Sequence, residues 1–261
     1  MRSAKKLLQS LLGRLGYQLI SNGKLDNLIN HADLSDRLSY LLAVAGDEVD
    51  RLPELICDCQ SQLGQDLFVL RALGWKRDGY FVEFGATNGR LLSNTWLLEQ
   101  RFGWKGILAE PARGWHGALA ASGRKAAIDF DCVWSRSGET LQFSENPAAE
   151  LSTLQSLYLR NHQGLNTAWH YPVKTVSLLD LLERHGAPAE IDYLSIDTEG
   201  SELDILSAFD FSRYRFRIIT CEHNYTDSRE AIHALLTRHG YTRHREDVSQ
   251  FDDWYVWAGS D

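Results

Sequence analysis

The sequence predicts an α/β fold built on one mostly parallel sheet, and three observations lead to this prediction. Short apolar runs recur along the chain, and segments with helical spacing separate most of them. The first run ends in a glycine-rich turn, which is typical of a nucleotide-binding fold. The last two runs, residues 241–245 and 253–258, are close enough to pair as an antiparallel hairpin. We therefore expect a seven-stranded sheet with an antiparallel last strand in residues 60–261, after an N-terminal helical extension, residues 1–59.

The first apolar run and the turn after it organise the rest of the chain. Tyr80–Phe84 is apolar with a single acid, which predicts a buried strand of a parallel sheet. Gly85 and Gly89 bracket the next turn, where a side chain would collide with a ligand approaching the backbone. The leucines of residues 91–98 then have helical spacing. Strand, glycine turn and helix form the first half of a nucleotide-binding βαβ unit.

Two acids beside this turn indicate the kind of nucleotide. Glu83 comes just before the turn, where it would repel a pyrophosphate and attract a cation. Glu110 follows the turn by about 20 residues, the spacing at which an acid binds a ribose diol. The dinucleotide pattern also needs a glycine where this chain has Thr87. The pattern therefore predicts a cationic nucleoside ligand, S-adenosylmethionine (SAM), rather than a nicotinamide dinucleotide.

The remaining elements follow in order. Further strands are expected at residues 104–109, 126–134, 191–196 and 216–221, with a short one at 141–143 and an extended segment at 173–176. Helices are expected at residues 24–56, 112–121, 178–185, 203–208 and 227–239. Residues 144–172 show no clear period, so they form either the wall of an acceptor pocket or a surface excursion.

Composition excludes some classes of protein. The net charge is −8 and the isoelectric point is about 5.6, which argues against a general nucleic-acid binder. Cys57 and Cys59 are too close for a zinc knuckle and no second pair follows. The four cysteines are therefore expected to be free thiols in a reducing cytoplasm. No apolar run reaches the length of a transmembrane helix.

The first 20 residues have the pattern of a basic amphipathic helix. Leucines recur on one face, and Lys5, Lys6 and Arg14 lie opposite them. Such a helix binds an anionic membrane surface, here the inner face, or docks on the domain or on a second subunit in a homo-oligomer. Polar residues interrupt the apolar part and no small-residue cleavage site follows, so a signal peptide is rejected.

Several of these stretches together resemble the FkbM-type methyltransferases. The matching residues are Ser61-Gln62, Gln65-Asp66, residues 82–89, Ser93-Asn94-Thr95, residues 103–106, Glu110-Pro111, residues 197–202 and Glu222-His223. The resemblance covers about residues 60–258. It implies the class I methyltransferase fold, which is Rossmann-like, and O-methyl transfer from SAM to sugar hydroxyls of glycosides or cell-surface polysaccharides.

The expected site lies where the parallel strands end, because open α/β sheets bind ligands beyond the carboxyl ends of their strands. The predicted cofactor-binding residues are Glu83, Gly85, Ala86, Asn88, Gly89, Ser93, Asn94, Glu110, Asp131, Cys132 and Asp197. An alcohol needs either a base or a metal ion to lose its proton at neutral pH. We expect His223 to act as the base with Asp197 beside it.

The carboxyl ends of the strands also carry candidate ligands for a metal ion, which could acidify the acceptor hydroxyl in place of a base. Asp197, Glu222 and Asn224 are candidate oxygen ligands for Mg²⁺, by analogy with metal-dependent catechol-type O-methyltransferases. Glu199 and Glu202 are expected to favour the N-terminus of the next helix. Two rival functions remain open: a nicotinamide-dependent oxidoreductase, and a noncatalytic binding protein on the same fold.

Overall fold

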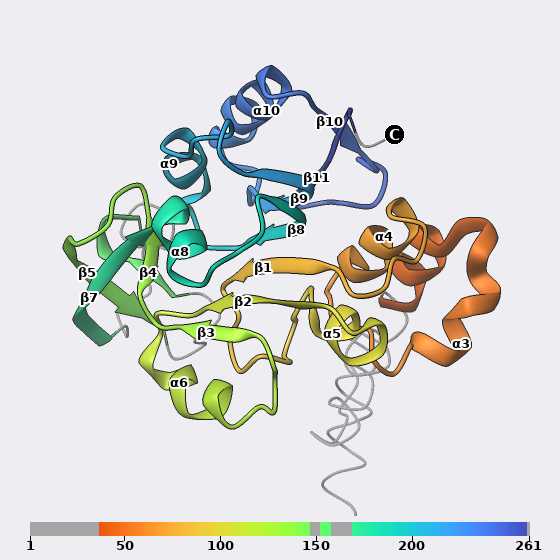
Figure 1. The fold of residues 1–261 in the computed structure, drawn as a ribbon, viewed down its shortest axis with the longest axis horizontal. Helices are drawn as coiled ribbons and strands as arrows, with labels where there is room; N and C mark the ends of the chain where they lie inside the picture. The colour runs from red at the N-terminus through yellow and green to blue at the C-terminus, as the bar shows by residue number, and fades with distance from the viewer. Residues whose placement is uncertain (1–36, 147–151, 158–168, 260–261) are drawn as a thin grey trace, which may run out of the picture. The chain divides into compact units, whose positions relative to one another are not determined.

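The computed structural model describes residues 37–146, 152–157 and 169–259 (Figure 1). The described residues from Leu41 onward form one compact unit. The predicted amphipathic helix of residues 1–20 lies outside the described residues, and the predicted domain boundary between residues 59 and 60 stays a prediction. Among the described helices, none has the length and apolar character needed to span a membrane.

A seven-stranded sheet forms the centre of the compact unit. Its strands lie in the order β10-β11-β9-β8-β1-β2-β3, and all are parallel except β11, which is antiparallel to both of its neighbours. This is the strand order of class I methyltransferases, and it confirms the predicted fold class and the hairpin at the end of the chain. The strands are β1 (Tyr80–Phe84), β2 (Lys105–Ala109), β3 (Ala127–Asp129), β8 (Glu190–Ile196), β9 (Arg215–Glu222), β10 (Tyr241–His244) and β11 (Asp252–Trp257).

Helices cover both faces of this sheet, as its continuous apolar strands require. Leucines and isoleucines of α8, α9 and α10 share one core with Val82, Phe84 and Ile107 of the sheet. On the other face, Phe68 of α4 packs on Trp254 of β11, with 4.8 Å between ring centroids. The helices are α4 (Gln65–Ala72), α5 (Trp96–Phe102), α6 (Arg113–Ala120), α8 (Leu178–Arg184), α9 (Glu202–Ser207) and α10 (Ser228–Arg238), preceded by η1 (Gly46–Arg51) and α3 (Leu52–Leu55).

A second, four-stranded sheet lies beside the first, with the order β4-β7-β5-β6 (Figure 1). Its strands are β4 (Cys132–Trp134), β5 (Thr140–Glu145), β6 (Thr153–Leu154) and β7 (Trp169–Ser177). The single strand predicted for residues 126–134 is therefore wrong, because β3 ends at Asp129 and β4 belongs to the second sheet. Asp129 accepts hydrogen bonds from the Asp131 backbone N–H at 2.9 Å and from Arg184 at 2.8 Å. These contacts turn the chain between the two sheets.

The helix predicted for residues 91–98 begins later than expected, at Trp96. The segment before it is a loop in which Leu92 has a positive φ of 56°. Glu83 accepts a hydrogen bond from the Asn94 backbone N–H at 2.6 Å, and its other oxygen accepts from the Ser93 hydroxyl at 2.9 Å. These bonds hold residues 93–95 against the end of β1 and delay the helix.

Candidate functional site

A cavity lies at the carboxyl ends of β1, β2 and β8, next to the point where the strand order reverses. Open α/β sheets bind their ligands at such a point. The empty space of the cavity is about 800 Å³ and includes a part that opens to solvent. Its lining includes Glu83, Gly85, Thr87, Leu92, Asn94, Glu110, Pro111, Cys132, Val133, Phe143, Ser152, Thr153, Leu154, Asp197, Thr198 and Glu199.

The glycine turn passes directly under the end of β8. Gly85 has a φ of +71°, and a Cβ atom added there would lie 2.2 Å from the backbone oxygen of Asp197. From the sequence, glycine is expected here because a ligand must approach the backbone closely. In the structure, the group that approaches Gly85 closely is the backbone of Asp197. Only glycine fits such a conformation and approach without strain.

Glu83 is buried, and both of its oxygens already bind the protein. Oε1 accepts from the Asn94 N–H, while Oε2 accepts from the hydroxyls of Ser93 and Thr95 at 2.9 and 2.5 Å. Burial raises the pKa of this carboxyl, and the charge of Arg124 opposes that rise. Glu83 thus lines the cavity and also holds the loop beside it, and its predicted contact with a ligand stays a prediction.

Asn94 offers the cavity an acceptor. Its side-chain amide donates to the Ser195 hydroxyl at 2.9 Å, while its buried Oδ1 has no hydrogen-bond partner among the described residues. Buried acceptors are nearly always paired in folded proteins. An ammonium or hydroxyl group of a bound ligand would satisfy this oxygen.

Glu110 ends β2 and ties the neighbouring turn to it. Its Oε2 accepts from the Thr87 backbone N–H and its Oε1 from the Ala112 N–H, both at 2.8 Å. Burial raises its pKa to about 7, and the nearby negative charge of Glu145 adds to the rise. Each carboxylate oxygen can accept a second hydrogen bond, so Glu110 can still receive the two hydroxyls of a ribose.

The structure separates the predicted cofactor residues into two groups. Six of them line the cavity: Glu83, Gly85, Asn94, Glu110, Cys132 and Asp197. The other five, Ala86, Asn88, Gly89, Ser93 and Asp131, are not among the described residues that line it.

Two residues of the second group have other partners. Asp131 forms an ion pair with Arg184 at 2.9 Å. Asn88 Oδ1 accepts from the backbone N–H groups of Arg90 and Leu91 at 2.9 and 2.7 Å, which closes the turn. In the first group, burial raises the pKa of the Cys132 thiol to about 12, so this side chain presents a neutral surface.

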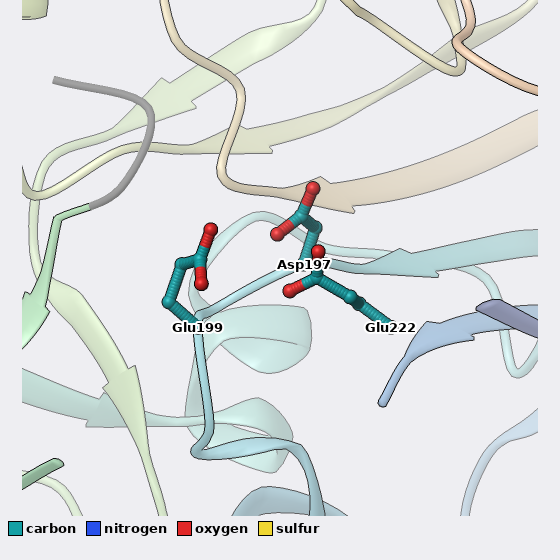
Figure 2. Close-up of side chains that lie close together, drawn as sticks. All are labelled: Asp197, Glu199 and Glu222. Carbon is teal, nitrogen blue, oxygen red and sulfur yellow. The ribbon is translucent and has the colours of Figure 1, made fainter. Parts of the chain in front are cut away.

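Three carboxylates meet at one side of the cavity. Figure 2 shows Asp197, Glu199 and Glu222 turned toward one another, and one oxygen from each lies within 4.8 Å of the others. Burial raises the pKa of Asp197 and of Glu222 well above the ordinary values, and the neighbouring negative charges raise them further. Such a group either shares protons or binds a cation, and carboxylate oxygens are suitable ligands for Mg²⁺.

The third member of this cluster differs from the predicted one. The sequence suggests Asn224, whose side-chain amide instead donates to Glu199 Oε2 at 3.3 Å. Glu199 stands in the cluster itself, although its place before a helix suggested only a role at the helix N-terminus. Its position three residues beyond the end of β8, close to that of Asp197 one residue beyond, was the available signal. Glu202 does lie at that helix start and accepts from the Gly200 N–H at 3.1 Å.

His223 is buried close to the cluster but faces another way. Its Nδ1 accepts from the Tyr225 backbone N–H at 3.0 Å, and its Nε2 lies 3.7 Å from Asp253 Oδ1. Burial lowers its pKa, which favours the neutral ring. His223 is not among the described cavity-lining residues, so its role as the base stays a prediction.

Three residues that line the cavity have a strained backbone. Thr87, Leu92 and Glu199 line it and have positive φ angles of 48°, 56° and 57°. Residues other than glycine rarely adopt this conformation, and where they do the site is often functional.

Comparison with known proteins identifies a family of similar sequences. The model of the methyltransferase FkbM domain matches residues 83–255. No curated protein sequence matches the chain. Among solved structures, the precorrin-6y C5,15-methyltransferase of Geobacter metallireducens is 13% identical, with 73% of this chain and 85% of that chain covered and a TM-score of 0.40. The human methyltransferase 10 domain containing protein is 14% identical, with 75% and 81% covered and a TM-score of 0.40.

Proposed function

Because the chain belongs to the FkbM methyltransferase family, we propose that it transfers a methyl group from SAM to an oxygen atom. The observation that carries the proposal is the cavity at the carboxyl edge of the sheet, which is lined by Glu110 and by Asn94, whose buried Oδ1 has no hydrogen-bond partner among the described residues. The acceptor is a sugar hydroxyl of a glycoside or a cell-surface polysaccharide, as the family resemblance implies.

The lining residues fit the parts of SAM. Glu110 has acceptor capacity left for the two ribose hydroxyls. Asn94 Oδ1, with Glu83 beside it, suits the ammonium group of the methionine part. Cys132, Val133 and their apolar neighbours offer a surface for the adenine ring. When bound, SAM supplies an activated methyl group on a sulfonium and a neutral sulfide leaving group.

The acceptor hydroxyl must lose its proton during the transfer, because its own pKa is about 15, near that of water. We assign this step to the carboxylates of Asp197 and Glu222, since burial and the neighbouring negative charges raise the pKa of each and make it a stronger base than an ordinary carboxylate. Asp197, Glu199 and Glu222 would hold a Mg²⁺ ion, which would lower the pKa of a coordinated hydroxyl. His223 is the alternative base, reached only if its ring turns toward the cavity.

The second sheet contributes to the acceptor side of the cavity. Phe143 of β5 and residues 152–154 line it, and the Thr153 hydroxyl donates to the Thr198 backbone oxygen at 3.0 Å. A glycan acceptor would therefore contact this sheet. We place the enzyme in the cytoplasm, with residues 1–20 available for contact with the inner membrane face or with a second subunit.

Binding and turnover test the proposal separately. Calorimetry with SAM should show saturable binding in the wild type, strongly weakened in Glu110→Ala, and no binding of NAD. Incubation with methyl-labelled SAM and total cell-surface glycans should transfer label to a carbohydrate fraction. Absence of SAM binding by the wild type would refute the proposal, and binding without transfer to any fraction would favour a noncatalytic protein on this fold.

A further inference from the structure

Arg124 is a fully buried charge that lies behind the cofactor cavity rather than in it. Its side chain is 0% exposed, and it comes from the loop between α6 and β3. Its Nε donates to Glu99 Oε2 at 2.8 Å, and that carboxylate is itself 2% exposed. A buried charge persists only when paired and hydrogen-bonded, so this arginine has a fixed position.

Two hydroxyl groups connect Arg124 to the carboxylate of Glu83. The Ser93 hydroxyl accepts from Arg124 Nη1 at 3.2 Å and donates to Glu83 Oε2 at 2.9 Å. The Thr95 hydroxyl accepts from Arg124 Nη2 at 2.7 Å and donates to the same oxygen. Glu83 therefore has a positive partner within the protein, reached through two hydroxyls. Asn94, the residue between them, is the one that lines the cavity.

The same guanidinium also holds the glycine turn. Its Nη1 donates to the backbone oxygen of Gly89 at 2.6 Å. At the other side of the turn, the Thr87 N–H donates to Glu110. The turn is thus attached at two points, one from each side. A Cβ atom on Gly89 would stand 3.2 Å from Arg124 Cγ, which shows how closely the two pack.

Lysine cannot replace these contacts. Arginine offers five donors in a planar fork, and Arg124 uses four of them at once, on Glu99, Gly89, Ser93 and Thr95. An ammonium group has three donors around one atom and cannot span these acceptors.

We infer that Arg124 is a positioning residue for the cofactor site. It sets the glycine turn and the Ser93-Asn94-Thr95 loop in the arrangement that binds the nucleoside and amino-acid parts of the ligand. The positioning follows from contacts within the protein, whereas its effect on SAM affinity rests on the proposed function.

The test compares Arg124→Lys with Arg71→Lys. Arg71 also binds a backbone oxygen and carboxylates, but those of Val44, Asp47 and Glu48, none of which lines the cavity. We expect Arg124→Lys to weaken SAM binding in calorimetry by about tenfold or more. Amide exchange should become faster within residues 85–95, while Arg71→Lys leaves both properties unchanged.

Two further outcomes are decisive. If Arg124→Lys matches Arg71→Lys in both measurements, the inference is overturned. If the wild type binds no SAM but residues 85–95 exchange faster in Arg124→Lys alone, the positioning holds and the proposed function fails. Thr95→Val removes one of the two hydroxyls that connect Arg124 to Glu83, at nearly constant side-chain volume. It should weaken SAM binding and speed amide exchange in residues 85–95, each by less than Arg124→Lys does. If Arg124→Lys does not fold, Thr95→Val replaces it in the test, and no change in either measurement would overturn the inference.

Discussion

The backbone oxygen of Asp197 lies 2.2 Å from the point that a Cβ atom on Gly85 would occupy. The turn after β1 and the end of β8 are therefore in contact, and the carboxyl group of Asp197 is held beside the turn. This approach links the cofactor cavity to the acidic cluster, because one strand end contributes to both.

Replacement of Gly85 by alanine should destabilise the protein. The positive φ and the contact with Asp197 together are expected to lower the free energy of unfolding by about 3 kcal/mol or more. Gly138→Ala is the matched control, since Gly138 has a φ of +81° and open space around its Cβ position. Gly138→Ala should lower the free energy of unfolding by only about 1 kcal/mol. Urea unfolding measures both, and equal losses would contradict a steric role for Asp197.

Replacement of Glu110 by glutamine should make SAM binding weaker and less dependent on pH. Burial raises the pKa of Glu110 to about 7, so the ionised form that accepts ribose hydroxyls is lost as the pH falls through neutral. Wild-type affinity should therefore decrease from pH 8 to pH 6, and Glu110→Gln should show a flat profile. Calorimetry at several pH values measures this. Glu183→Gln, on the exposed side of α8, should retain the wild-type profile.

The acidic cluster should govern the rate of methyl transfer. Asp197→Asn and Glu222→Gln are each expected to lower kcat by about a hundredfold while SAM affinity changes less. Because burial raises the pKa of both carboxyls, wild-type activity should fall as the pH is lowered and the cluster takes up protons. Initial rates across pH measure this, and an acid-stable rate would argue for another base, for which His223 is the candidate.

Removal of divalent cations tests whether the cluster also holds a metal. If Asp197, Glu199 and Glu222 bind Mg²⁺, thorough chelation should abolish methyl transfer, and added Mg²⁺ should restore it. Glu199→Gln should then require more Mg²⁺ for half-maximal activity. Full activity after chelation would show that the cluster needs no metal ion, and proton transfer would be its one remaining proposed role.

Asp252 should make the protein less stable at high pH. Burial raises its pKa to about 7, although Gln65 donates to it at 2.8 Å. A carboxyl whose folded pKa lies above its unfolded value stabilises the protein at low pH, and this stabilisation is lost as the pH rises through about 7. Between pH 5 and pH 8 the free energy of unfolding of the wild type should fall by about 1–3 kcal/mol through this group. In Asp252→Asn this part of the decrease should be absent. Urea unfolding at the two pH values measures the difference.

Local patterns in the sequence were sufficient for most of the elements. The apolar run Tyr80–Phe84, the glycines after it and the two last strands all appear where the pattern predicts them. Long-range contacts changed the rest. The strand predicted for residues 126–134 is divided because Asp129 binds Arg184 and His185, about 55 residues further along the chain. No local period records such a contact.

The roles of the site residues depended even more on distant partners. The sequence placed Glu83, Glu110, Asp197 and Glu222 at strand ends, and the structure brings them to one edge of the sheet. It did not indicate that the Ser93 and Thr95 hydroxyls connect Glu83 to Arg124, or that Glu199 rather than Asn224 completes the cluster. Both depend on loops whose course is decided by packing.

The sequence by itself determined the fold class and the strand ends that carry the acids, because apolar periodicity and glycine positions act over a few residues, and the resemblance of its motifs indicated the family. Only the tertiary structure decided which side chains face the cavity and which support it from behind. Hydrogen bonds and burial depend on atoms that approach from distant parts of the chain, and these distances exist only once the chain is folded.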